Sequence, residues 1–328
     1  MEAQREPKYI YEIYPGKSRT LLWGHIVTGK DHWAFGVTLL LLHAPIVLFA
    51  VFVCPYLYIN ISPALIYIFA YIYLICVLSM FKTSWTDPGI LPRNLDPTPP
   101  VEHERHAPNS SEEEEGDNQY MYHPTFPIPR DVRVNGIVTK LKYCDTCRIY
   151  RPPRCSHCRQ CDNCVENEDH HCIWLNNCVG RRNYRYFFAF ILSATLLCFY
   201  VFSFSLAHLI LYMKSNQETI GENFSFLDSI LANPVSLVLV IYTFVFEWSL
   251  GGLTVYHLYL VSKNMTTHEQ IRSAVSTRET INPFDFGGIW TNCYHFISRP
   301  RPRSHIDWTG IIPADEDEVV PINPSRAV

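Results

Sequence analysis

Cysteine and histidine residues crowd into one stretch of the sequence, from position 144 to position 178. Eight of the twelve cysteines and three of the fourteen histidines fall there. They are Cys144, Cys147, Cys155, Cys158, Cys161, Cys164, Cys172, Cys178, His157, His170 and His171. The repeated Cys-x-x-Cys spacing lets two thiolates reach one Zn²⁺ ion, so the stretch predicts metal binding.

The supply of ligands exceeds what structural zinc needs. Two closed tetrahedral sites would use eight of the eleven side chains, and three would remain. Spacing alone leaves open which three are free, but the run from Asp169 to Cys172 stands out. A histidine there could take the thiol proton while the aspartate orients the imidazole, which would give an activated nucleophile. Equally, the run could be the end of a purely structural zinc module.

Long uncharged stretches flank this cysteine-rich region. Residues 33–81 and 186–213 contain no Asp, Glu, Lys or Arg, and residues 229–262 contain only Glu247. A membrane span needs about 20 apolar residues, so the first stretch holds two spans and the other two hold one each. An acid within a span usually faces the bundle interior, and we expect Glu247 to pair with His208, His257 or a tyrosine.

The distribution of basic residues predicts the orientation of the four spans. With an even number of spans, 26 of the 27 Lys and Arg residues fall on one side of the membrane. The positive-inside rule makes that side cytosolic, together with both termini and the cysteine-rich region. Because the cytosol is reducing, a disulfide framework is not expected, and zinc is the better reading of the cysteines.

We therefore predict an all-α polytopic membrane protein with four transmembrane helices. A small cytosolic zinc-binding cysteine-rich domain would lie between spans 2 and 3. The predicted segments are a cytosolic N-terminal segment (1–32), a transmembrane hairpin (33–81), a cytosolic linker with an acidic disordered part (82–139), the cysteine-rich domain (140–185), a second transmembrane hairpin (186–262) and a cytosolic C-terminal segment (263–328). In the last of these we expect order as far as Ser304 and a loose chain beyond it.

These motifs resemble the DHHC protein S-acyltransferases, also called palmitoyltransferases. The resemblance is carried by Cys144-x2-Cys147, Arg151-Pro152-Pro153-Arg154, His157-Cys158-x2-Cys161-x2-Cys164, Asp169-His170-His171-Cys172, Cys178, Asp87-Pro88-Gly89, Thr266-Thr267-His268-Glu269 and the segment from Asn282 to Asn292. Within the family, the run around Cys172 and Tyr184 looks most like the fungal Ras palmitoyltransferase catalytic subunit and its animal relatives.

The resemblance implies two structural zinc sites and one catalytic thiol. One site would use Cys144, Cys147, His157 and Cys164, and the other Cys158, Cys161, His171 and Cys178. Cys172 would then be the nucleophile, His170 the base and Asp169 the residue that orients it. Cys155 would be a surplus thiol.

The family also implies a donor substrate, a long-chain acyl-CoA such as palmitoyl-CoA. Arg151 and Arg154 would contact the CoA phosphates and Trp174 would line the acyl pocket. Thr267 and Asn292 would give structural support. For the two arginines, a structural salt bridge within the zinc module is the alternative reading.

Partners and location follow from the resemblance alone. It implies transfer to membrane-proximal cysteines of proteins such as Ras-type GTPases, a smaller accessory subunit, and a multi-pass location among the lipids of the endoplasmic reticulum or Golgi membrane. No nucleic-acid partner is expected. The alternative function is a non-catalytic, zinc-stabilised membrane scaffold or adaptor.

Overall fold

The computed structural model describes residues 8–102, 126–220, 223–275 and 281–312. Most of the acidic linker that we expected to be disordered, and the end of the C-terminal segment, lie outside these residues. The described helices are α1 (Ile10–Ile13), α2 (His32–Phe52), α3 (Cys54–Asn60), α4 (Ala64–Trp85), α5 (Tyr184–Ile220), α6 (Phe226–Ala232), α7 (Pro234–Ser262), α8 (Thr267–Val275), α9 (Ile289–Ser298) and the short 3₁₀ helix η1 (Ile173–Leu175).

Four helical segments are long and apolar enough to cross a membrane, as the uncharged stretches predicted. They are 32–60, 64–85, 184–219 and 234–262. The first of these segments comprises α2 and α3 and ends at Asn60. Pro55 lies in the first turn of α3, where its missing N–H group leaves no hydrogen bond unmade.

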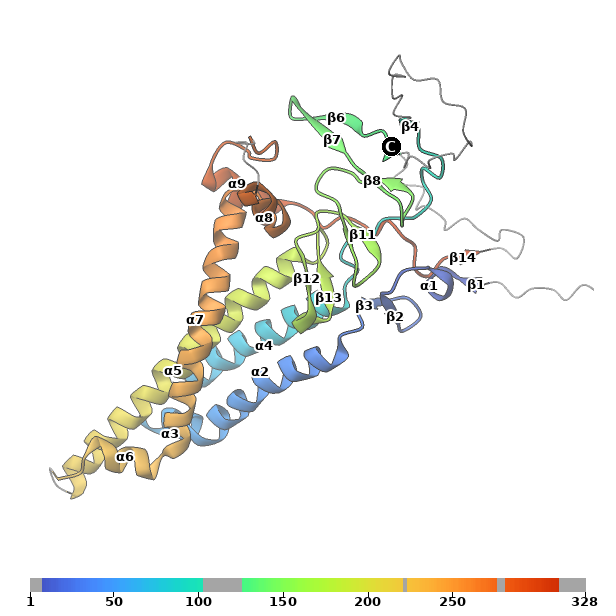
Figure 1. Ribbon diagram of the computed structural model, residues 1–328. Coiled ribbons are helices and arrows are strands. Elements are labelled where there is room, and N and C mark those ends of the chain that lie inside the picture. Colours follow the sequence, from blue (N-terminus) through green and yellow to red (C-terminus); the bar gives the residue numbers. More distant parts are fainter. Residues whose placement is uncertain (1–7, 103–125, 221–222, 276–280, 313–328) are drawn as a thin grey trace, which may run out of the picture.

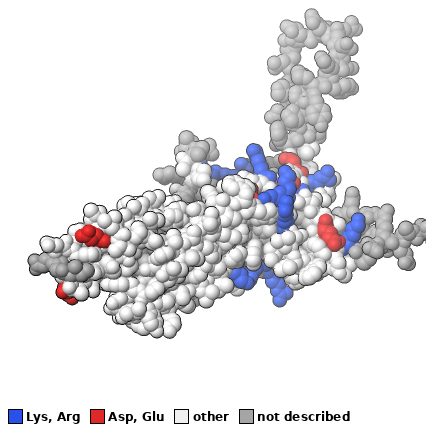
Figure 2. All heavy atoms as spheres, turned by 90° about the horizontal axis from the view of Figure 1, so that it is seen from below, with Lys and Arg blue, Asp and Glu red and all other residues white. Residues whose placement is uncertain are grey.

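The four spans pack into one elongated bundle with the cysteine-rich region at one end (Figure 1). Helix α5 packs against both α4 and α7, and the bundle interior contains Phe49, Leu57, Phe69 and Leu239. Charged side chains are sparse along the helices in Figure 2, whereas Lys and Arg gather where the spans meet the cysteine-rich end. This distribution is typical of a multi-pass membrane protein.

The cysteine-rich region is built from short antiparallel hairpins between α4 and α5, an arrangement that the all-α prediction did not anticipate. The described strands are β1 (Lys8–Tyr9), β2 (Arg19–Leu21), β3 (Ile26–Thr28), β4 (Val101–Glu102), β5 (Phe126–Pro127), β6 (Arg130–Val134), β7 (Ile137–Leu141), β8 (Tyr143–Cys144), β9 (Ile149–Tyr150), β10 (Ser156–Cys158), β11 (Asn163–Val165), β12 (His170–Cys172), β13 (Asn177–Val179) and β14 (Ile311–Ile312). Each pairs with one neighbour only.

Residues 305–312 are packed against the rest of the molecule, which corrects the expectation of a loose chain directly after Ser304. Ile306, Trp308 and Ile312 are buried with Ile10 and Val27 in one apolar cluster, and β14 pairs with β1. The apolar residues of this short run share this cluster with residues of the N-terminal segment and of the cysteine-rich region, a contact that sequence spacing does not reveal.

Candidate active site and metal centres

Hairpins β8–β9 and β10–β11 bring together the first set of metal-ligand candidates. Cys144, Cys147, His157 and Cys164 form one group whose ligand atoms lie within 4.8 Å of one another. The three sulfur atoms are 3.6, 3.4 and 3.8 Å from His157 Nδ1. All three cysteines are buried.

A second group of the same composition spans β10 to β13. It consists of Cys158, Cys161, His171 and Cys178. The sulfur atoms lie 3.6, 3.4 and 3.4 Å from His171 Nδ1. Tetrahedral zinc with Zn–S bonds of about 2.3 Å and Zn–N bonds of about 2.0 Å separates S from N by about 3.5 Å. Both groups therefore fit a closed Cys₃His zinc site.

Each histidine in these groups also meets a carboxylate through its other ring nitrogen. His171 Nε2 is 2.9 Å from Asp31 Oδ2, and His157 Nε2 is 3.4 Å from Asp162 Oδ1. Such carboxylates orient zinc-ligating histidines. Sequence reasoning missed Asp31, since it lies 140 residues from His171 and carries no motif of its own.

Cys172 belongs to neither of the two groups found among the described residues. It is the last residue of β12 and is only partly buried. Its side chain packs against an apolar cluster that includes Met80 of α4, Leu175 of η1 and Phe187 of α5. The thiol thus lies where the zinc-ligand hairpins meet the ends of the membrane helices.

His170 and Asp169 form a short hydrogen bond beside this thiol. His170 Nδ1 lies 2.7 Å from Asp169 Oδ2, and Asp169 is 2% exposed. Burial opposes the charge on His170, but hydrogen bonds with Asp169 and with Cys172 outweigh it and raise the pKa of the imidazole to about 9. Burial likewise opposes the charge on Asp169, yet His170 and Thr267 together lower the pKa of this carboxyl. The pair is therefore poised as imidazolium and carboxylate.

Helix α8 supplies the remaining partners of Asp169. The backbone N–H of Thr267 donates to Asp169 Oδ1, and the Thr267 hydroxyl donates to Oδ2, both at 2.8 Å. Thr266 and Glu269 close a reciprocal capping pair at the start of this helix, as expected of a Thr followed three residues later by Glu. The motif after span 4 thus holds the carboxylate that orients His170.

Arg154, a candidate CoA contact, is instead engaged in a salt bridge. Its Nε and Nη2 donate to the two carboxylate oxygens of Glu269 at 2.9 and 2.7 Å, and Nη2 also donates to the carbonyl of Asn264 at 3.0 Å. Its side chain is 7% exposed and lies over the ring of Phe284. These contacts favour the structural reading of Arg154 that the sequence had left open.

Arg151 and Trp174 have different surroundings. Arg151 Nε is buried with no hydrogen-bond partner among the described residues, and the side chain lines a cavity of about 600 Å³. Four more basic residues line that cavity: Lys140, Lys142, Arg154 and Arg272. Trp174 is 49% exposed and belongs to η1, which packs against α2 and α4.

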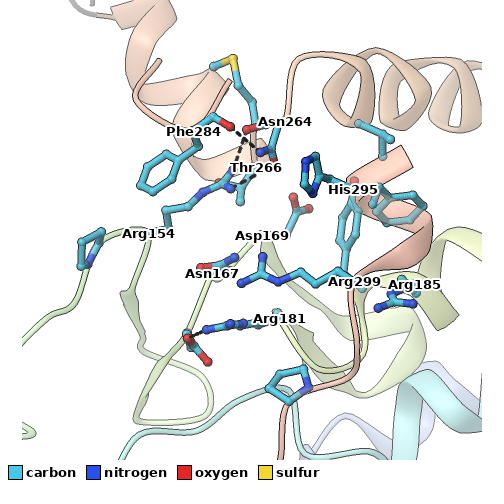
Figure 3. A pocket seen from close by; sticks show the side chains of 18 of the residues that line it. Arg154, Asn167, Asp169, Arg181, Arg185, Asn264, Thr266, Phe284, His295 and Arg299 are labelled. Carbon is cyan, nitrogen blue, oxygen red and sulfur yellow. Dashed lines mark hydrogen bonds and ion pairs between the residues drawn. The ribbon is translucent and has the colours of Figure 1, made fainter. Parts of the chain in front are cut away.

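A second basic cavity, of about 720 Å³, is lined by Asp169 (Figure 3). Cys172 is not among the residues that line it. Arg154, Arg181, Arg185 and Arg299 all line it. Arg181 forms an ion pair with Glu166, and Arg185 donates to the carbonyl of Ile297 at 3.0 Å. Four arginines thus face two carboxylates, Glu166 and Asp169, in the lining of this cavity.

Asn292 joins the C-terminal helix α9 to the end of the last span. Its side-chain amide donates to the carbonyl of Ser262 and to Asp285, each at 2.9 Å, and its oxygen accepts the N–H of Phe286 at 3.0 Å. The residue is fully enclosed.

Two residues of the membrane spans, Tyr184 and His257, lie near the His170–Asp169 pair, and the sequence did not predict them there. The hydroxyl of Tyr184 lies 3.0 Å from His257 Nδ1, and the ring centroid of His257 is 6.1 Å from that of His170. His257 is thus engaged with Tyr184, and His208 with Ser236. The expected pairing with Glu247 does not form, since Glu247 Oε2 has no hydrogen-bond partner in the described structure.

Comparisons with known proteins agree with this arrangement. A family model described as DHHC palmitoyltransferase matches residues 137–274. The chain is 37% identical to Palmitoyltransferase ZDHHC14 of Homo sapiens over 100% of its own length and 66% of that protein. It is 39% identical to Palmitoyltransferase ZDHHC18 of Mus musculus over 95% and 78%. It is 42% identical to Protein S-acyltransferase 8 of Arabidopsis thaliana over 83% and 65%. The chain thus spans between 65% and 78% of the length of these relatives.

Proposed function

This chain belongs to the DHHC palmitoyltransferase family, and from that premise we propose that it transfers a long-chain acyl group from acyl-CoA to cysteines of other proteins. One observation carries the proposal. A thiol outside both metal-ligand groups, Cys172, lies beside the His170–Asp169 pair and against the apolar ends of the helices. A structural zinc module alone has no need of such a residue.

In the first half-reaction, the Cys172 thiolate attacks the thioester carbonyl of acyl-CoA. The new bond joins Sγ to the carbonyl carbon, the carbon–sulfur bond to CoA breaks, and the CoA thiolate leaves. His170 Nε2 is the nitrogen not bonded to Asp169, so in the imidazolium it holds the proton that came from the thiol, and it donates this proton to the leaving sulfur. The products are acyl-Cys172 and CoA.

In the second half-reaction, a cysteine of the acceptor protein attacks acyl-Cys172. His170 accepts the proton of the incoming thiol and donates it to Cys172 as the acyl group departs. Asp169 keeps the imidazole in the tautomer that leaves Nε2 free, and Thr267 holds Asp169 in place. The enzyme is restored, and the mechanism is ping-pong.

The surroundings of Cys172 suit a substrate with one apolar and one charged end. The acyl chain would lie among the helices around Cys172, with Trp174 at the mouth. Each buried CH₂ contributes about 0.8 kcal/mol, so the chain supplies much of the affinity. The CoA phosphates would lie in the 600 Å³ basic cavity, where Arg151 is a better candidate ligand than the already paired Arg154.

The assignment of Arg151 is testable by kinetics. In Arg151→Ala the KM for palmitoyl-CoA should rise at least several-fold, because a phosphate contact is lost, while zinc content stays unchanged. Arg159→Ala, at an exposed position, is the matched control. An unchanged KM in Arg151→Ala would remove this residue from the CoA site.

Two zinc ions would be held by the Cys₃His groups, and their role is to fix the fold of the hairpins that carry the active residues. His171, a ligand candidate, lies between His170 and Cys172 on β12. Zinc binding by His171 would therefore hold the backbone of His170 and Cys172 in place.

The acceptors, partner and location remain those implied by the resemblance. We propose Ras-type GTPases with membrane-proximal cysteines as acceptors, a smaller accessory subunit, and a cytosolic active site at the endoplasmic reticulum or Golgi membrane. Acyl transfer from the purified chain to the C-terminal peptide of a Ras-type GTPase tests the first of these. Loss of transfer when the peptide cysteine is changed to serine is the control.

The decisive experiment compares the wild-type chain with Cys172→Ser. After incubation with labelled palmitoyl-CoA, the wild type should carry a hydroxylamine-sensitive acyl group and release CoA, and the variant should do neither. The variant should keep its zinc. A wild-type chain that forms no acyl-enzyme would favour the non-catalytic scaffold instead.

A further inference from the structure

The N-terminal hairpin β2–β3 ends in a turn of unusual composition. Its four residues run from Leu22 to His25, and the N–H of His25 donates to the carbonyl of Leu22 at 3.2 Å. The central residues Trp23 and Gly24 have φ of 54° and 86°, which defines a type I′ turn. Asparagine and glycine are the usual residues at these positions.

Gly24 is required by a close approach on the inner side of the turn. A Cβ at this position would lie 2.9 Å from the backbone oxygen of Trp308, and Trp308 is itself buried in the N- and C-terminal cluster. Leu22 also adopts a positive φ, of 48°. Leu22 and Trp23 thus carry large apolar side chains at positions where the backbone conformation disfavours them.

The tip of the hairpin exposes these apolar side chains. Leu21, Leu22 and Trp23 are 48%, 60% and 73% exposed. An exposed Leu-Leu-Trp tip needs a partner when it faces water. The same residue types are favoured at the boundary between lipid and water, where Trp lies at the level of the headgroups.

The hairpin lies against an exposed apolar side of α4. A cavity of about 480 Å³ is lined by the turn and β3 on one side and by Leu78, Phe81, Lys82 and Trp85 on the other. Leu78 and Trp85 are 55% and 40% exposed on a candidate membrane span. The exposed apolar surface of α4 thus extends to the side of the molecule on which the β2–β3 hairpin lies.

Basic side chains surround the same region. Arg19 at the start of β2, Lys82 near the end of α4, and Arg301 in the C-terminal segment are all exposed. Lys82 and Arg301 line the cavity between the hairpin and α4. An apolar tip ringed by cations is complementary to a leaflet that contains anionic lipids.

Hydrogen bonds at both ends of the hairpin connect it to the candidate active site. Just before β2, the N–H of Lys17 donates to the carbonyl of Cys161, a zinc-ligand candidate, at 2.8 Å. At the other end, the hydroxyl of Thr28 donates to the carbonyl of Asn176 at 3.0 Å. Asn176 ends η1, which follows Cys172.

We propose that the β2–β3 tip is a membrane anchor, in which Leu22 and Trp23 insert into the lipid interface of the leaflet facing the zinc-ligand hairpins. Together with the spans, it fixes the height and tilt of the β12–β13 hairpin, which carries Cys172, relative to the bilayer. The insertion itself is independent of catalysis. Its effect on the reaction rests on the proposed acyltransferase function.

Photo-crosslinking in lipid nanodiscs tests the insertion. Benzoylphenylalanine replaces Trp23 in the full-length chain, reconstituted in phosphatidylcholine with phosphatidylserine. The control places the same probe at Val138, an exposed apolar position of β7. After illumination, mass spectrometry should find lipid adducts at position 23 and far fewer at position 138. Equal adducts at both positions, or a protein adduct in place of lipid at position 23, would overturn the proposal.

Two variants test the consequence for catalysis. Trp23→Phe keeps an apolar ring at the tip, and Trp23→Asp places a charge there. In nanodiscs, acyl-Cys172 should form several-fold more slowly in Trp23→Asp than in Trp23→Phe, while zinc content stays equal in both, which excludes misfolding. Equal rates at equal zinc content would refute the role in positioning Cys172. The lipid adduct at position 23 is readable even in a chain that forms no acyl-enzyme.

Discussion

Asp169 acts on Cys172 only through another residue. It is buried, its pKa is lowered, and its hydrogen bond to Nδ1 leaves Nε2 of His170 for the thiol. The same carboxylate stabilises the protonated ring, whose pKa is raised to about 9. An amide at this position would keep the size of the side chain and lose the charge.

We therefore expect Asp169→Asn to form acyl-Cys172 more slowly by a factor on the order of 10² or more, the usual contribution of positioned proton transfer. Zinc content should not change. Single-turnover labelling with palmitoyl-CoA measures the rate, and Asp131→Asn, at an exposed position, is the control. A rate within about twofold of wild type would show that the His170–Asp169 pair does not promote acylation of the Cys172 thiol.

At the scale of elements, α8 connects the end of the last span to the active residues. Its first residue, Thr267, donates twice to Asp169, and Glu269, two residues later, binds Arg154 of the hairpin region. The helix therefore couples the zinc-ligand hairpins to α7. This explains why a short Thr-Thr-x-Glu motif lies directly after a membrane span.

Thr267→Val should weaken the support of Asp169 without changing the shape of the side chain. A hydrogen bond to a charged group contributes about 1.5–3 kcal/mol, so we expect acylation of Cys172 to slow roughly tenfold or more. Thr267→Ser retains the hydroxyl and should restore most of the rate. If the serine variant is as slow as the valine variant, packing and not the hydrogen bond is responsible.

At the scale of the whole molecule, the zinc-ligand groups join segments that are distant in the sequence. Asp31, at the start of the first span, reaches His171, and Lys17 binds the backbone of Cys161. Loss of this second group should therefore release the N-terminal segment as well as the β12–β13 hairpin.

We expect Cys158→Ser to lose one zinc equivalent and to unfold at a markedly lower temperature, because binding of structural zinc is coupled to folding. Cys155→Ser is the matched control, since Cys155 is buried nearby but belongs to neither group. Metal analysis and thermal unfolding of the purified chains measure both effects. Equal zinc content in the two variants would contradict the assigned ligand sets.

The number of spans and the region that holds the metal-ligand groups could be predicted from the residues alone. Uncharged stretches of sufficient length have few alternatives to spanning a bilayer, because the backbone must satisfy its own hydrogen bonds there. The close spacing of the cysteines likewise confines the metal ligands to one small region. Both are local properties that can be recognised in a single segment.

Folding in three dimensions selects the distant groups that complete the site. Asp31 lies 140 residues from His171, and Arg154 lies 115 residues from Glu269, the acid with which it pairs. The ordered run from Ile306 to Ile312 also depends on a distant N-terminal partner. Such contacts are chosen by packing in three dimensions, and the linear order of residues does not encode them in any local pattern.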